Sequence, residues 1–173
     1  GASPRTGACL LALANIRRFT VKPIFLSAAL MMSAAAAAQA CPDYRLGGDV
    51  DYGFTGDILL REREYSVQIG TDYSLVGCGH QYPGYVSAAP TTSFRLARMD
   101  HYPLEIRVKA PCDSVLLVNA ANGDWYYNDD GPYGHNPQIN LRGSATLNGR
   151  VDIWVGSYDG QSCFGDLILE TER

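Results

Sequence analysis

The first 40 residues contain no aspartate, glutamate, tyrosine or tryptophan. All 18 acidic residues lie in residues 41–173, which hold only 10 of the 14 lysines and arginines and therefore carry a net charge of −8. Such a charge excludes nucleic acid as a partner, because a phosphate backbone requires a basic surface. The same segment contains all 11 tyrosines and both tryptophans, which excludes an acidic disordered tail.

Residues 1–40 have the organisation of a secretory signal. A basic region at 17–22 is followed by an apolar run at 23–32 and by small residues at 34–40 that end in Ala-Gln-Ala. We therefore expect cleavage after Ala40 and a secreted, extracellular or periplasmic domain of residues 41–173, with no transmembrane span left. A retained membrane anchor is the alternative, but the second half of the run is alanine and serine instead of leucine or isoleucine.

Cys41 would be the first residue after that cleavage site. A cysteine there also suggests a lipid anchor, although Ala38 stands where a lipoprotein signal normally has leucine. Lipidation through Cys41 is therefore a minor alternative to free secretion.

Residues 41–173 contain no C-x-x-C motif and no cysteine beside a histidine pair, which disfavours zinc binding. An even number of cysteines in an exported domain predicts disulfides, here between Cys41, Cys78, Cys112 and Cys163. We favour Cys112 with Cys163, since each lies in a loop beside a predicted strand at one end of a sandwich. Cys41 would then pair with Cys78, and the other two connectivities stay open.

Long helical periodicity is absent, and alternation of apolar and polar residues recurs instead. Residues 104–109, 151–155 and 65–69 each place apolar side chains on one face, which predicts half-buried strands. Residues 115–118 are continuously apolar, which predicts a strand covered on both faces. Trp154 is out of phase with the valines and isoleucine around it, so we expect an exposed aromatic unless a second layer covers it.

Three dipeptides supply the positive φ angles of tight hairpins, namely Asn122-Gly123, Asn148-Gly149 and Asp159-Gly160. They predict pairing of 114–119 with 124–128, of 139–147 with 151–156, and of 151–156 with 164–170. Three hairpin signals at this density favour an all-β fold, an antiparallel β-sandwich of the jelly-roll or Greek-key kind stapled by disulfides.

The order of motifs in residues 103–170 is distinctive. It reads PLEIRVKAPCDSVLLVNAANGDWYYNDDGPYGHNPQINL and then GRVDIWVGSYDG. This order resembles the bacterial pre-peptidase C-terminal domain, a small β-sandwich found beside the catalytic domains of secreted proteases. The resemblance implies a stand-alone, non-catalytic accessory module that binds a polysaccharide or a protein surface.

A peptidase-related hydrolase is the first alternative function, and a structural or assembly role at the cell envelope is the second. No Gly-Asp-Ser-Gly-Gly motif occurs, and in the segment 156–160 the serine stands one position too early for a nucleophile elbow. We therefore predict no catalytic residues. The isolated histidines His80, His101 and His135 lie in loop-like contexts, and the alternating charges of 61–64 suggest protection of a sheet edge.

The loop 124–131 concentrates oxygen-bearing side chains. Calcium prefers such ligands, and a structural ion could be held, with help from Asp113 or Asn136, by Asp124, Asn128, Asp129 and Asp130. Asparagine and aspartate also order loops without metal through Asx turns, and we favour that simpler interpretation.

Aromatic residues gather in the same region. A rigid aromatic platform could recognise a sugar ring or a polypeptide, and the candidate ligand-binding residues are Trp125, Tyr126, Tyr133, Trp154 and Tyr158. The simpler alternative is core packing. Because Trp125 and Tyr127 share a strand face, we expect one of Trp125 and Tyr126 to point inward and the other outward.

Overall fold

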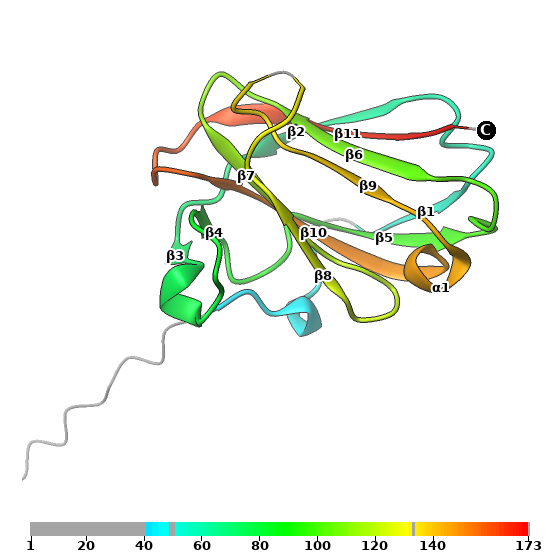
Figure 1. The fold of residues 1–173 in the computed structure, drawn as a ribbon, viewed down its shortest axis with the longest axis horizontal. Helices are drawn as coiled ribbons and strands as arrows, with labels where there is room; N and C mark the ends of the chain where they lie inside the picture. The colour runs from blue at the N-terminus through cyan, green and yellow to red at the C-terminus, as the bar shows by residue number, and fades with distance from the viewer. Residues whose placement is uncertain (1–40, 49–50, 133, 173) are drawn as a thin grey trace, which may run out of the picture. The chain divides into compact units, whose positions relative to one another are not determined.

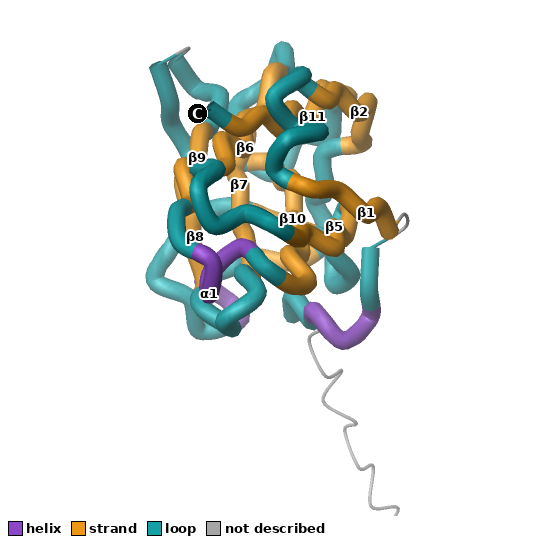
Figure 2. The backbone as a smooth tube through the Cα atoms, turned by 90° about the vertical axis from the view of Figure 1, so that its right-hand side faces the viewer, coloured by secondary structure: helices purple, strands orange, loops and turns teal. Residues whose placement is uncertain are grey.

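The computed structural model describes residues 41–48, 51–132 and 134–172, and the predicted signal segment lies outside them. The described residues form two stacked β-sheets, connected by loops and three short helices (Figure 1 and Figure 2). This arrangement confirms the predicted all-β sandwich. In the part of the chain that is described, no helix has the length and apolar character needed to cross a membrane.

The smaller sheet has four antiparallel strands. In spatial order they are β2 (Arg63–Gln68), β11 (Phe164–Thr171), β6 (Leu104–Lys109) and β9 (Gln138–Leu141). In β6 the alternate residues Leu104, Ile106 and Val108 are buried, as the alternation predicts. The two charged residues between them are only partly exposed.

The larger sheet has seven strands. Five follow one another across it, namely β1 (Asp51–Thr55), β5 (Thr92–Ala97), β10 (Gly149–Ser157), β7 (Ser114–Asn119) and β8 (Trp125–Asn128). β1 runs parallel to β5, and the other pairings in this sheet are antiparallel. Two short strands, β4 (Tyr85–Val86) and β3 (Tyr73–Ser74), continue the sheet from the C-terminal end of β10.

The main core fills the space between the sheets. β6 and β11 supply it from the smaller sheet, while Leu116 and Val118 of β7 and alternate residues of β10 supply it from the larger one. Burial of each such side chain contributes about 1.5–3 kcal/mol, which makes this core the main source of stability.

A second apolar cluster lies on the outer face of the larger sheet. Val115, Leu117 and Trp154 point away from the main core and pack against Leu75 and Val86. The covering layer consists of β3, the short helix η2 (Val76–Cys78) and β4. β7 is therefore buried on both faces, as predicted.

Trp154 corrects a sequence expectation. It lies on the face opposite Val151, Ile153 and Val155, as its phase requires. However, its side chain is 0% exposed, so it is not a surface aromatic. The reason is the layer 73–86, which covers this face, and the Trp154 indole N–H is directed to the carbonyl of Ala88 at 3.4 Å. Strand phase alone does not reveal such a layer.

Of the three predicted hairpins, only the one at Asn122-Gly123 pairs as expected, joining β7 to β8. The pairing of 139–147 with 151–156 is wrong, because β9 pairs with β6 in the smaller sheet and the short helix α1 (Ser144–Leu147) follows. Asn148 ends that helix, and its side-chain oxygen accepts a hydrogen bond from the Met99 amide at 2.9 Å.

The expected pairing of 151–156 with 164–170 is also wrong. A turn does occur at Asp159-Gly160, but the chain then crosses to the other sheet, where β11 pairs with β2 and β6. The edges of β10 are already taken by β5 and β4 on one side and β7 on the other. A turn signal predicts a change of direction without fixing which sheet the chain enters next.

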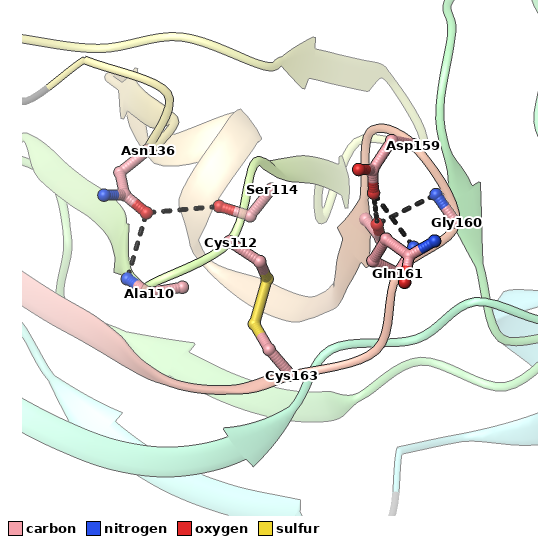
Figure 3. The surroundings of a disulfide bond; sticks show 9 residues. Ala110, Cys112, Ser114, Asn136, Asp159, Gly160, Gln161 and Cys163 are labelled. Carbon is pink, nitrogen blue, oxygen red and sulfur yellow. Dashed lines mark hydrogen bonds between the residues drawn. A yellow bond between two sulfur atoms is a disulfide. The ribbon is translucent and has the colours of Figure 1, made fainter.

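Both predicted disulfides are present. Cys112–Cys163 joins the β6–β7 connection to the β10–β11 connection, and the two loops lie side by side (Figure 3). Cys41–Cys78 joins the segment before the short helix η1 (Tyr44–Leu46) to η2 of the covering layer. Cys112–Cys163 therefore ties together two loops that connect the sheets, and Cys41–Cys78 ties the N-terminal segment to the outer layer.

Candidate functional site

Exposed tyrosines gather at the C-terminal end of β10. Tyr82, Tyr85 and Tyr158 are 40%, 36% and 39% exposed, and Tyr127 of β8 lies half-buried beside them. Tyr85 is paired with Ser157, the last residue of β10. We call these four residues the tyrosine surface.

Tyr82 and Tyr127 form a rigid pair. Their rings are stacked with centroids 4.5 Å apart and an angle of 7° between planes. The Tyr127 hydroxyl donates a hydrogen bond to the Pro83 carbonyl at 2.9 Å, which ties β8 to the loop that carries Tyr82. Burial raises the pKa of Tyr127, and the carboxylate of Asp129 adds to that rise, so the hydroxyl stays a neutral donor.

The turn after β10 positions Tyr158. The Ser157 hydroxyl donates to Asp159 Oδ1 at 2.9 Å and accepts from the Gly160 amide at 3.0 Å. The Gln161 amide also donates to Asp159 at 2.9 Å (Figure 3). The bond from the Gln161 amide is the largest cause that lowers the pKa of Asp159, and the bond from the Ser157 hydroxyl adds to it. Ser157 is fully buried, so its hydroxyl orders this turn and is not presented as a nucleophile.

Carboxylates lie close to the tyrosines. His135 Nδ1 is 3.7 Å from Asp113 and 3.6 Å from Asp130. Burial raises the pKa of Asp113, the nearby imidazole opposes that rise, and the carboxylates of Asp130, Asp159 and Asp129 add to it. The carboxylates of Asp129 and Asp113 also raise the pKa of the Tyr127 hydroxyl. The tyrosine surface therefore adjoins four acidic side chains.

The predicted calcium ligands do not all come together. Asn128 Oδ1 accepts hydrogen bonds from the Asp129 and Asp130 amides at 3.0 and 3.4 Å, which is the Asx turn expected without metal. Asp124 lies at the other end of β8, where Asn122 donates to it at 2.6 Å. Across the described ranges, no three side chains of histidine, cysteine, aspartate or glutamate are arranged to hold a metal ion. Calcium binding stays a prediction from composition.

The predicted aromatic residues are divided between packing and surface. Trp125 is half-buried and packs against Trp154, with ring centroids 5.2 Å apart, and Tyr126 packs against the main core. Tyr126 therefore points inward to the main core, as expected of one of the two residues, and Trp125 lies on the opposite, outer face, where it is partly buried instead of fully exposed. Tyr158 is exposed as a site residue should be, whereas Tyr133 lies outside the described residues.

Sequence reasoning did not find Tyr82 and Tyr85. Tyr82 lies in the irregular segment 79–84, and Tyr85 begins the two-residue strand β4, which is too short for an alternation to show which side chains face solvent. The short spacing of two tyrosines around Pro83-Gly84 is the signal that was available.

A cleft of about 640 Å³ forms a second feature, lined by residues of β1 and β2. These two strands are the outer strands of their sheets and lie on the same side of the sandwich (Figure 2). Tyr52 and Tyr65 contribute to its lining, and their rings are tilted against each other with centroids 4.7 Å apart. Burial raises the pKa of Tyr65, and Tyr52 adds to that rise. The cleft shares no residue with the tyrosine surface.

No protein-family model matches the sequence, and no curated protein matches it. Solved structures that this chain resembles in part include the two that follow. The pre-peptidase C-terminal domain of collagenase from Bacillus anthracis is 14% identical, with a TM-score of 0.37 over 71% of this chain and 95% of that one. PliG from Aeromonas hydrophila, a periplasmic inhibitor of g-type lysozyme, is 10% identical, with a TM-score of 0.40 over 71% of this chain and 100% of that one.

The first of these structures is a domain of the family that residues 103–170 resemble. The β-sandwich that the resemblance implies is present in this chain's own sheet topology.

Proposed function

We propose that this protein is an exported, non-catalytic binding module that recognises a positively charged protein surface through the tyrosine surface. The observation that carries the proposal is the rigid stack of Tyr82 on Tyr127 beside four carboxylates. Residues 41–173 carry a net charge of −8, which favours association with a basic partner.

The chemistry of the surface supports a protein ligand. Tyrosine provides a large contact area at a small entropic cost, because its ring has few rotatable bonds. Lysine and arginine bind both to the face of a tyrosine ring and to carboxylates. An exposed tyrosine such as Tyr158 next to the exposed carboxylate of Asp159 therefore suits a cationic side chain.

The test measures binding of deca-arginine and deca-glutamate peptides to the oxidised protein by calorimetry. We expect deca-arginine to bind and deca-glutamate not to bind. Tyr82→Ala or Tyr158→Ala should weaken deca-arginine binding about two- to fivefold, the loss of one exposed cation–π contact, whereas Tyr82→Phe should retain it.

Matched controls lie at the opposite end of the domain. Tyr44 is 47% exposed on η1, near the N-terminal end of β10, and Tyr44→Ala should leave the affinity unchanged. Asp130→Asn should weaken binding, and Asp100→Asn should not. Equal effects of the site variants and their controls would overturn the proposal, as would binding of a neutral polysaccharide in preference to both peptides.

A further inference from the structure

The outer edge of β2 carries backbone groups that no other described strand pairs. β2 is the terminal strand of the smaller sheet and pairs only with β11. The Ile69 amide donates to the Cys163 carbonyl at 2.9 Å, which identifies this residue pair as hydrogen-bonded. In an antiparallel ladder, hydrogen-bonded and non-hydrogen-bonded pairs alternate along the strand.

This alternation assigns the direction of each backbone group in β2. Residues 63, 65 and 67 share the phase of Ile69 and bond to β11. Glu64, Ser66 and Gln68 have the opposite phase, so their N–H and C=O groups point away from the sheet. We call these three residues the β2 edge. Their spacing of two residues matches the repeat of an added strand, over a length of about 13 Å.

The β2 edge borders the 640 Å³ cleft. One wall is the run from Glu64 to Asp72, the opposite wall consists of Ser87 and residues 89–92, and Tyr52 of β1 also contributes. The cleft closes where the chain crosses to the larger sheet, because the Gly70 amide donates to Val155 at 2.9 Å. The site is therefore bounded and next to free strand backbone.

The opposite wall is held by hydrogen bonds of its own. The Ser87 hydroxyl donates to the Ala89 carbonyl at 2.7 Å, and Thr91 Oγ1 accepts from the Val155 amide at 2.9 Å. Pro90 is buried between these residues. A wall fixed in this way requires little ordering when a ligand binds, which favours affinity.

The charge of the cleft selects the ligand. Among the described residues, Glu64 and Asp72 are the charged ones that line it, both are exposed, and no lysine, arginine or histidine is among them. A ligand with positive side chains is therefore complementary. The regular spacing of the backbone groups favours a polypeptide over a sugar, because only an extended chain repeats donors and acceptors at that interval.

We propose that the β2 edge and the adjoining cleft bind an extended, positively charged polypeptide segment of a partner protein by β-strand addition. The segment pairs its backbone with Glu64, Ser66 and Gln68. Its alternate side chains face the cleft, whose lining includes the carboxylates of Glu64 and Asp72. This site is separate from the tyrosine surface, and its test does not depend on the function proposed there.

The test uses a seven-residue peptide of alternating lysine and valine with blocked ends. Hydrogen exchange followed by NMR should show that the amides of Glu64, Ser66 and Gln68 become protected when the peptide is added. The same peptide with glutamate in place of lysine should bind more weakly. A version N-methylated at every second residue, on the side that pairs, should lose binding and needs no change to the protein.

Two substitutions at one residue separate backbone from side chain. Ser66→Pro removes an outward N–H without touching the bonds to β11, and should weaken lysine–valine peptide binding about tenfold, the value of one well-made hydrogen bond. Ser66→Ala keeps the N–H and should bind normally. Glu64→Gln and Asp72→Asn should each weaken binding, and Asp100→Asn should not.

Three results would overturn the proposal. The first is unchanged exchange at the three amides at peptide concentrations up to about 1 mM. The second is equal binding of the N-methylated peptide, or protection at Tyr82 and Tyr158 only, which would assign the peptide to the tyrosine surface. The third is protection that rises with protein concentration without peptide, because a second copy of the chain would then occupy the edge.

Discussion

Asp152 of β10 is buried, and its carboxylate accepts hydrogen bonds from the Ser93 hydroxyl of β5 and from Arg150 Nε at 2.9 Å. Ser93 Oγ in turn accepts the Gly48 amide at 2.8 Å, and Arg150 also donates to the Tyr44 carbonyl at 2.7 Å. The network fastens the segment 43–48 to the larger sheet. A Cβ on Gly48 would lie 2.5 Å from the backbone of Thr92, so only glycine allows this approach.

We predict that Arg150→Met lowers the free energy of unfolding by about 2–4 kcal/mol, because it leaves the buried Asp152 carboxylate without a cation. The double variant Arg150→Met/Asp152→Asn should recover part of that loss. Urea unfolding with an unchanged m-value measures both. A change in the free energy of unfolding under about 0.5 kcal/mol for Arg150→Met would show that the guanidinium does not stabilise the buried Asp152 carboxylate.

Trp154 should behave as a core residue. Trp154→Ala removes a fully buried side chain from the second apolar cluster and should cost about 3–5 kcal/mol, measured by thermal or urea unfolding. In Trp125→Phe, the remaining Trp154 fluorescence should be blue-shifted and shielded from quenchers. Red-shifted emission would mean that the layer 73–86 does not cover this face in solution.

Asn128→Ala should lower the melting temperature by the same amount in calcium and in chelator. Its side chain orders the loop by accepting from the amides of Asp129 and Asp130 and by donating to the Gln138 carbonyl at 2.8 Å. Asp129→Asn/Asp130→Asn is the comparison variant. A calcium-dependent rise in melting temperature that this double variant abolishes would establish a metal site instead.

The pKa of Asp113 is raised by burial, so the folded state holds its proton more tightly than the unfolded chain. Its contribution to stability is therefore present below the usual value of 3.8 and is lost as the pH rises through the raised folded value. Asp113→Asn should remove this loss of stability, as measured by unfolding curves from below pH 3.8 to above the raised pKa of Asp113.

Asp43 is the matched control, with the opposite sign. The Arg45 guanidinium lowers the pKa of Asp43 to about 2, so its contribution is lost as the pH falls from 3.8 to about 2. Asp43→Asn should change the free energy of unfolding only between pH 3.8 and about 2. The same pH profile for both variants would contradict the assignment.

Local patterns in the sequence predicted a large share of the fold. The alternation at 104–109 predicted β6 with its buried face, and the apolar run at 115–118 predicted a strand covered on both sides. The spacing of turn residues predicted the β7–β8 hairpin, and the placing of Cys112 and Cys163 in loops predicted their disulfide. These features follow from side-chain periodicity and φ preferences within a few residues.

The candidate sites depended on contacts that no local pattern records. Asp124 and Asp130 are close in sequence but lie beyond opposite ends of β8, whereas Asp113 and Asp130 are brought together by the connections around β7 and β9. Tyr82 meets Tyr127 only because the covering layer lies over β8. The cleft beside β2 likewise combines residues 52, 64–72, 87 and 89–92.

The amino-acid sequence by itself determined the strands of the regular part of the fold, such as β6, β7 and β10, and the turn at Asn122-Gly123, because these depend on short-range periodicity and backbone preference. Only the tertiary structure decided that the chain changes sheets at Asp159-Gly160, that Trp154 is covered, and which tyrosines and strand edge face solvent. The physical reason is that strand pairing and burial depend on the competition among all segments for the same edges and faces, not on any one segment alone.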